Sequence, residues 1–259
     1  MTDDALSPDG IQIRFDVDGA GPRAIVFVHG WSCDRTYWAP QMRAFADRHE
    51  VVTVDLAGHG ESGVGRSSWT MAAFGDDVVA VVEKLGLEDG VLVGHSMGGD
   101  VIVEAALRLG DRVRGLVWVD TYATLGEIRT AEEVEAFAAP IRRDFVAATR
   151  ELVRRTLFVP TSEPELVERI AADMAAAPPD IAIDALVHAI DNDSAILAGL
   201  PRLTAPVVAI NGDYRPTDIE SMARHGVRAV VMSGVAHFPM LEQPERFNDL
   251  LGEIIVSFD

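Results

Sequence analysis

The sequence predicts an α/β protein in which a mostly parallel sheet is flanked by helices and interrupted by one helical insertion. Short apolar runs that suit buried strands alternate with segments of helical spacing, which is the pattern of strand–helix–strand units. The clearest junction lies in residues 90–100, where an apolar run ends in a Gly-rich turn and helical spacing begins. From residue 122 to about residue 198 the strand signal disappears and only helical patterns remain.

The N-terminal part of the chain predicts three strands and one helix. Residues 11–17 alternate apolar and polar side chains, as an edge strand with one solvated face would. Residues 24–28 and 51–54 are apolar runs that predict buried strands, and residues 37–48 predict a helix between them. The loop after the second of these strands contains His59, which we expect to be structural because it lies in a turn.

The central part predicts two further strands. Residues 71–85 have helical spacing, and Gly86 is a suitable C-terminal stop for that helix. Residues 91–93 form a buried strand with the junction described above, and residues 115–119 form another, which ends at Asp120.

The helical insertion predicts a cap over a site. Its patterns cover residues 130–157, 163–177 and 180–190, with prolines between them. We therefore expect a core domain of residues 1–121 and 199–259 and a helical cap of residues 122–198. Most apolar cap side chains should pack on one another and on the core, and a minority should line the cavity; the apolar residues of the cap include Phe137, Ile141, Phe145, Leu157, Phe158 and Met174. Strands at 206–210 and 227–232 and a helix at 244–258 complete the chain.

Residues 94–98 read Gly-His-Ser-Met-Gly at the strand-to-helix junction. So sharp a turn forces its apex, Ser96, into a strained backbone conformation, and side chains at positions 94 and 98 would collide across it. This is the G-x-S-x-G nucleophile elbow in its expected context of strand before and helix after. The turn exposes the Ser96 hydroxyl and points the Met97 amide into the space beside it. A hydroxyl is a poor nucleophile alone, so the chain must supply a base and an oxyanion site.

Composition limits the classes of partner. A net charge of −19 disfavours nucleic acid and anionic membrane surfaces. No apolar run is long enough for a membrane span, and the N-terminal segment lacks a signal-peptide pattern. The single Cys33 cannot form an internal disulfide and fits a reducing compartment, so a cytoplasmic protein is expected. No spaced Cys/His cluster suggests a metal, and nothing in the chain indicates its oligomeric state.

Four motifs together resemble the α/β-hydrolase fold family of serine esterases and their relatives. They read HGW at residues 29–31, DLAGHGES at 55–62, GHSMGG at 94–99 and GVAHFPMLE at 234–242, and the resemblance covers nearly the whole chain. It implies a mostly parallel eight-stranded sheet with the helical cap inserted between strands 6 and 7. It also implies that Ser96 is the nucleophile, that His237 is the general base and then the general acid, and that the Trp31 and Met97 amides form the oxyanion hole.

His237 fits this role better than the other six histidines. It alone follows the last strand by a short loop, from which it can reach over the sheet toward Ser96.

The triad acid is where the sequence departs from the family pattern. Relatives typically carry it as Gly-x-x-Asp after the strand that follows the cap, but this chain has Arg215 at that place. Asp213 lies in the same loop, two residues early, and Asp120 ends the strand before the cap, a position that some family members use. Either carboxylate could orient His237. We favour Asp120, because a strand end holds a carboxylate more rigidly.

The resemblance implies hydrolysis of a small-molecule carboxylic ester or related acyl substrate, without metal or organic cofactor. Serine at the elbow argues against the dehalogenases and epoxide hydrolases of this fold, which use Asp there. Hydrolysis of a C–C bond, lactone or amide, or acyl transfer, would use the same motifs. A different class of function is a ligand-binding receptor or regulatory protein that keeps the triad but turns over slowly or not at all.

Overall fold

The computed structural model describes all residues from 1 to 259 and contains one eight-stranded sheet. The strand order is β1-β2-β4-β3-β5-β6-β7-β8; β2 pairs antiparallel with β1 and β4, and all other neighbours are parallel. The mostly parallel eight-stranded prediction is therefore confirmed. The strands are β1 Thr2–Leu6, β2 Gln12–Asp18, β3 Ala24–Val28, β4 Glu50–Val54, β5 Gly90–His95, β6 Val113–Val119, β7 Val207–Gly212 and β8 Val227–Met232.

The expectation that residues 11–17 form the edge of the sheet is wrong, because β1 pairs along the outer side of β2. The first strand has the polar sequence TDDAL, which gives no apolar alternation to detect. The segment is a strand because its backbone pairs with β2. The polar face of residues 11–17, which suggested an edge strand, therefore belongs to the second strand of the sheet.

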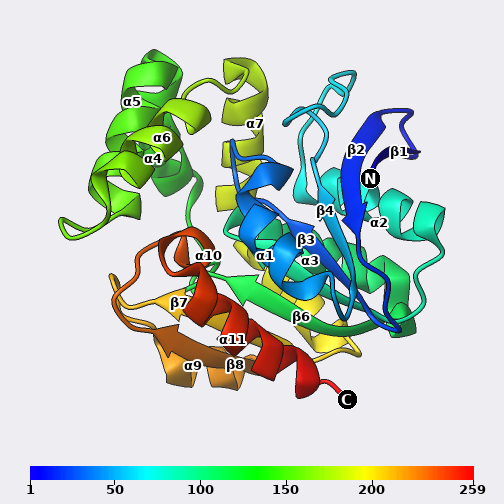
Figure 1. Ribbon diagram of the computed structural model, residues 1–259. Helices are drawn as coiled ribbons and strands as arrows, with labels where there is room; N and C mark the ends of the chain where they lie inside the picture. Colours follow the sequence, from blue (N-terminus) through cyan, green and yellow to red (C-terminus); the bar gives the residue numbers. More distant parts are fainter.

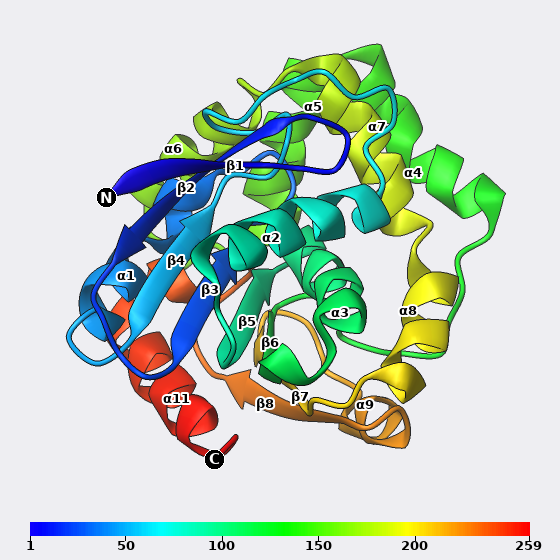
Figure 2. The ribbon, with the colours of Figure 1, turned by 90° about the vertical axis from the view of Figure 1, so that its right-hand side faces the viewer.

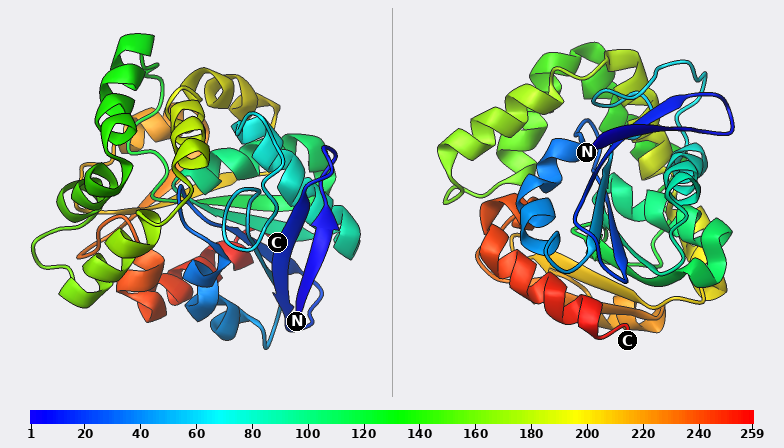
Figure 3. Two further views of the ribbon diagram at one scale, coloured as in Figure 1. Left: turned by 90° about the horizontal axis from the view of Figure 1, so that it is seen from above. Right: turned by 45° about the vertical axis from the view of Figure 1, so that its right-hand side comes forward.

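Helices cover both faces of the sheet. The short helix α1 (Ala39–Phe45) and the C-terminal helix α11 (Pro244–Val256) lie on one face, while α2 (Met71–Leu85) and α3 (Met97–Leu109) pack together on the other (Figures 2 and 3). The predicted helix at 37–48 is in fact a 3₁₀ turn, Arg35–Trp38, followed by α1. Gly86 ends α2 in a left-handed conformation with φ 65°, as expected for its position.

Five helices lie between β6 and β7; the first four lie above the sheet in Figure 1, and the fifth packs against α3 (Figure 2). The first predicted pattern is divided at Asp144, which ends one helix and caps the next through its side chain. A π-helical turn, Val153–Leu157, follows. The cap helices are α4 Ala131–Arg143, α5 Phe145–Leu152, α6 Pro164–Met174, α7 Pro179–Ile190 and α8 Asp193–Gly199; two short helices of the core, α9 Ile219–Arg224 and α10 Pro239–Glu242, were not anticipated.

The hydrophobic core follows the central parallel strands. Every residue of β3, β5 and β7 is buried, which is the burial expected for strands covered on both faces. The carboxyl ends of these strands therefore lie at one rigid edge, beneath the cap helices. No helix is both long enough and apolar enough to cross a membrane.

Candidate active site

Ser96 lies at the apex of the turn between β5 and α3, with φ 51° and ψ −120°. A non-glycine residue with positive φ is strained, and here its backbone amide is held by Val119 O at 2.9 Å. The flanking glycines are required sterically: a Cβ on Gly94 would lie 2.2 Å from Gly98 O, and one on Gly98 would lie 2.6 Å from His29 O. The predicted geometry of the elbow is thus present.

The His237 imidazole contacts a buried carboxylate. Its Nδ1 lies 2.5 Å from Asp120 Oδ2, and the Asp120 side chain, at the end of β6, is fully buried. Asp120 itself has positive φ, 50°, so the strand end turns to present this carboxylate to the loop after β8. The other oxygen, Oδ1, accepts a hydrogen bond from the Gly212 amide at 3.1 Å.

Two residues that the sequence reasoning did not assign to the site also hold Asp120. The Tyr214 hydroxyl donates to Asp120 Oδ2 at 2.7 Å, and Arg215 Nη2 lies 3.4 Å from the same oxygen. Burial raises the pKa of Asp120, but the hydrogen bond and charge of His237, the charge of Arg215 and the Tyr214 hydroxyl outweigh it, so the pKa is lowered overall. The carboxylate is therefore ionised at neutral pH. The sequence signal that could have identified these two residues is the Tyr214-Arg215 pair, which stands where family members typically carry the triad acid.

Asp213 points elsewhere. Its side chain is exposed, and its Oδ1 accepts a hydrogen bond from the Gly234 amide at 2.9 Å. Of the two aspartates that the sequence left open, the structure brings only Asp120 into contact with His237.

The loop that carries His237 is fixed on three sides. Its amide donates to Leu157 O of the cap at 3.2 Å, and its carbonyl accepts from His95 Nε2 at 2.8 Å. The Glu242 carboxylate accepts from the amides of Ala236 and Phe238, on either side of the histidine, at 3.0 Å each. The imidazole is thus held by the core and the cap together.

The Trp31 and Met97 amides have no hydrogen-bond partner within the protein. Met97 is the first residue of α3, where amides lack intrahelical partners and the helix dipole favours negative charge. The Trp31 loop lies against the elbow, since a Cβ on Gly30 would be 2.8 Å from His95 Nδ1. The Trp31 indole donates to Ala182 O of α7 at 2.6 Å, which ties this loop to the cap.

Ser96, Trp31, Met97 and His237 line one cavity of about 910 Å³ between the core and the cap. Neither Ser96 Oγ nor His237 Nε2 forms a hydrogen bond within the protein. Four of the six apolar cap residues named from the sequence line this cavity, namely Phe137, Leu157, Phe158 and Met174, while most other apolar residues of 122–198 do not, in agreement with the expectation of a minority. Phe145 packs instead against Trp31, at 6.2 Å between ring centroids.

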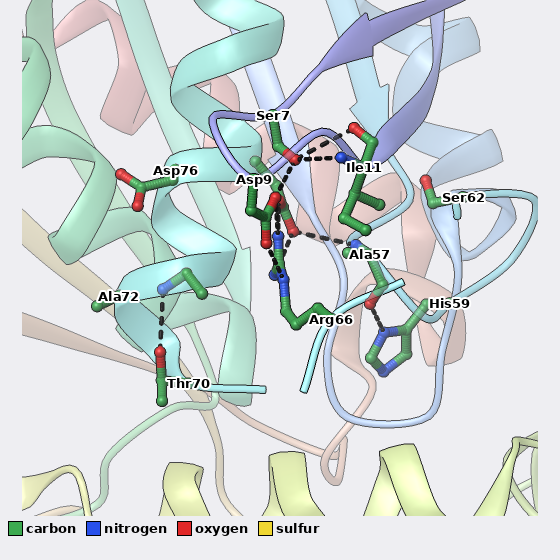
Figure 4. A network of polar contacts seen from close by, with 12 residues as sticks. Ser7, Asp9, Ile11, Ala57, His59, Ser62, Arg66, Thr70, Ala72 and Asp76 are labelled. Carbon is green, nitrogen blue, oxygen red and sulfur yellow. Dashed lines mark hydrogen bonds and ion pairs between the residues drawn. The ribbon is translucent and has the colours of Figure 1, made fainter. Parts of the chain in front are cut away.

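The loop after β4 is fixed by the ion pairs of the buried Arg66 side chain rather than by contact with the cavity. Arg66 bonds to Asp9 at 2.8 Å and to the fully buried Asp77 at 2.6 Å, and Asp77 also accepts from the Ala57 amide at 3.1 Å (Figure 4). His59 is buried in the same loop, with Nδ1 bonded to Ala57 O at 3.0 Å. Burial, with the charge of His29, lowers the His59 pKa to about 3. It does not line the cavity, in agreement with a structural role.

No group of three or more His, Cys, Asp or Glu side chains is arranged to hold a metal ion. Cys33 does line the cavity, but burial raises the pKa of its thiol. Ser96 is therefore the better placed nucleophile, because the thiol is not ionised at neutral pH.

Comparison with known proteins gives one family and several similar structures. Residues 25–250 match the model of the alpha/beta hydrolase family. A thermophilic esterase from Thermogutta terrifontis is 28% identical with a TM-score of 0.83, covering 100% of this chain and 99% of that one. Est816, described as an N-acyl homoserine lactone degrading enzyme, is 27% identical with a TM-score of 0.81, covering 96% and 99%. The 3-oxoadipate enol-lactonase 2 of Acinetobacter baylyi is 23% identical over 99% of this chain and 97% of its own length.

Proposed function

The chain belongs to the alpha/beta hydrolase family, and we propose that it is a serine hydrolase that cleaves carboxylic esters through an acyl-enzyme on Ser96. Similarity to esterases and to an enol-lactonase supports hydrolase activity. One observation carries the finer proposal: a strained, half-buried serine and a histidine that contacts a buried carboxylate line the same cavity.

In the proposed reaction, His237 Nε2 takes the Ser96 proton as Oγ attacks the substrate carbonyl. The developing oxyanion accepts hydrogen bonds from the Trp31 and Met97 amides, each of which contributes about 3 kcal/mol to transition-state stabilisation. His237 then protonates the leaving alkoxide, and water hydrolyses the acyl-enzyme by the same steps in reverse. Asp120 accepts a hydrogen bond from His237 Nδ1–H and stabilises the imidazolium once His237 has taken the Ser96 proton, which requires the ionised carboxylate that its lowered pKa supplies.

Lactone opening is the second candidate, and the names of two relatives favour it. One similar protein is described as degrading N-acyl homoserine lactones and another as an enol-lactonase. The chemistry is the same except that the leaving alkoxide remains attached to the acyl group. Hydrolysis rates of a panel of γ- and δ-lactones, measured from the protons released, would be compared with the rates for open-chain esters of equal size.

The deciding experiment measures hydrolysis of p-nitrophenyl acetate and butyrate by the wild type and by Ser96→Ala. We expect rapid turnover that is abolished in the variant, and a serine-directed phosphonate that labels Ser96 with matching loss of activity. Cys33→Ala is the control, because its thiol is a second nucleophile on the cavity wall; this variant should keep its activity. Turnover that survives Ser96→Ala would refute the proposal, and tight ligand binding without turnover would favour a receptor.

A further inference from the structure

A buried carboxyl group lies in the cavity wall beyond the proposed reaction centre. Asp100 is on the first turn of α3, is only 4% exposed, and lines the same cavity as Ser96. Its Oδ1 accepts a hydrogen bond from the Tyr122 hydroxyl at 2.8 Å, and Tyr122 also lines the cavity. The side-chain amide of Asn192, a buried donor with no other partner, is the second polar group beside this carboxyl, and Tyr122 is the only group that bonds to it at a normal hydrogen-bond distance.

No cation pairs with Asp100. The charged and titratable groups around it are Tyr122 after β6, Arg129 before α4, and Asp193 at the start of α8. Arg129 is bound to both carboxylate oxygens of Asp193 at 3.0 Å, so its charge is already engaged. Burial raises the pKa of Asp100 to about 8, with the charge of Asp193 adding to the effect and Tyr122 opposing it. At neutral pH the group is therefore mainly a neutral acid, which has an O–H donor to offer.

We propose that Asp100 and Tyr122 form a subsite that binds a second, neutral oxygen acceptor of the substrate, such as a ketone, amide carbonyl or hydroxyl. The inference rests on the proposed function and names its substrate class. Asp100 lies four residues beyond Ser96, about 6 Å along the helix axis, so the acceptor should stand about three or four bonds from the attacked carbonyl. A buried donor left unpaired is costly, so esters that lack this oxygen are discriminated against.

The test compares two acyl groups of similar shape, 4-oxopentanoate and 4-methylpentanoate. As p-nitrophenyl esters at pH 6.5, we expect the oxo ester to have a kcat/KM about tenfold higher, the size expected for one hydrogen bond. Asp100→Leu should remove the preference, while Asp100→Asn should keep most of it, because its amide still donates. Equal kcat/KM for the two esters, or a preference that survives Asp100→Leu, would overturn the proposal.

Two further measurements identify the donor and separate this inference from the proposed function. Between pH 6.5 and 9 the preference should fall in the wild type, as Asp100 loses its proton, but not in Asp100→Asn. Calorimetry measures how tightly the Ser96→Ala variant binds methyl 4-oxopentanoate and methyl 4-methylpentanoate, without turnover. The preference therefore remains measurable even if the wild type does not hydrolyse esters. An ester with an aminoalkyl acyl group that is favoured, and loses this advantage in Asp100→Asn, would show an amine site instead.

Discussion

Replacing Asp120 with asparagine should nearly abolish turnover, because the structure constrains how the new amide lies. The Gly212 amide donates to Oδ1 at 3.1 Å and, as backbone, cannot become an acceptor. The orientation that keeps this bond places the asparagine oxygen there and turns its NH₂ toward His237 Nδ1. The Tyr214 hydroxyl can rotate to accept from that NH₂, and Arg215 keeps Asp120 O as its acceptor at 3.3 Å. The imidazole would then carry its proton on Nε2 and could not accept the Ser96 proton. In the opposite orientation the NH₂ would face the Gly212 amide, donor against donor, at a cost of about 1–3 kcal/mol. That orientation would also lack the negative charge that stabilises the imidazolium.

We expect kcat to fall by about 10³- to 10⁴-fold, or about 4 to 5.5 kcal/mol in the activation barrier. The assay is p-nitrophenyl butyrate hydrolysis, with circular dichroism and the Tm used to confirm that the variant is folded. Asp213→Asn is the matched control and should stay within about twofold of wild type, since its exposed side chain contacts only the Gly234 amide, at 2.9 Å. If Asp120→Asn keeps more than a tenth of kcat while Asp213→Asn loses most of it, the reasoning is wrong.

Three further predictions concern Glu242, Gly94 and His59. Glu242→Ala should lower kcat by about 10- to 100-fold, because it frees the loop of His237. Glu242→Gln should keep most of kcat, because a single oxygen, Oε1, accepts from both flanking amides. An equal loss of kcat in both variants would contradict a positioning role. Gly94→Ala should destabilise the fold by over about 3 kcal/mol in urea unfolding, whereas Gly90→Ala, in the same strand with its nearest neighbour at 3.8 Å, should be tolerated. Burial keeps His59 neutral in the folded protein, so the unfolded chain takes up a proton as pH falls below about 6.5 and stability declines. His59→Gln should reduce that decline by about 1.4 kcal/mol per pH unit between pH 6 and 4.5; an unchanged slope would refute a neutral His59.

The central strands could be predicted from the sequence because their burial on both faces requires continuous apolar runs. Residues 24–28 were predicted with the bounds that β3 has. Residues 227–232 match β8, which lies at the sheet edge and is only partly buried, so its signal is the run of valines rather than burial on both faces. The first strand escaped prediction, since its TDDAL sequence becomes a strand only by pairing with β2. The break at Asp144 was also missed, because both sides of it have helical spacing.

The sequence by itself determined the elbow at Ser96, because the steric limits of a sharp turn act between residues two positions apart and are visible in any local reading. Only the tertiary structure decided which carboxylate meets His237, and that Tyr214 and Arg215 hold that carboxylate from the other side. These contacts join the ends of β6, β7 and β8. Their distances depend on strand order, register and the turn at each strand end, which no spacing along the chain encodes.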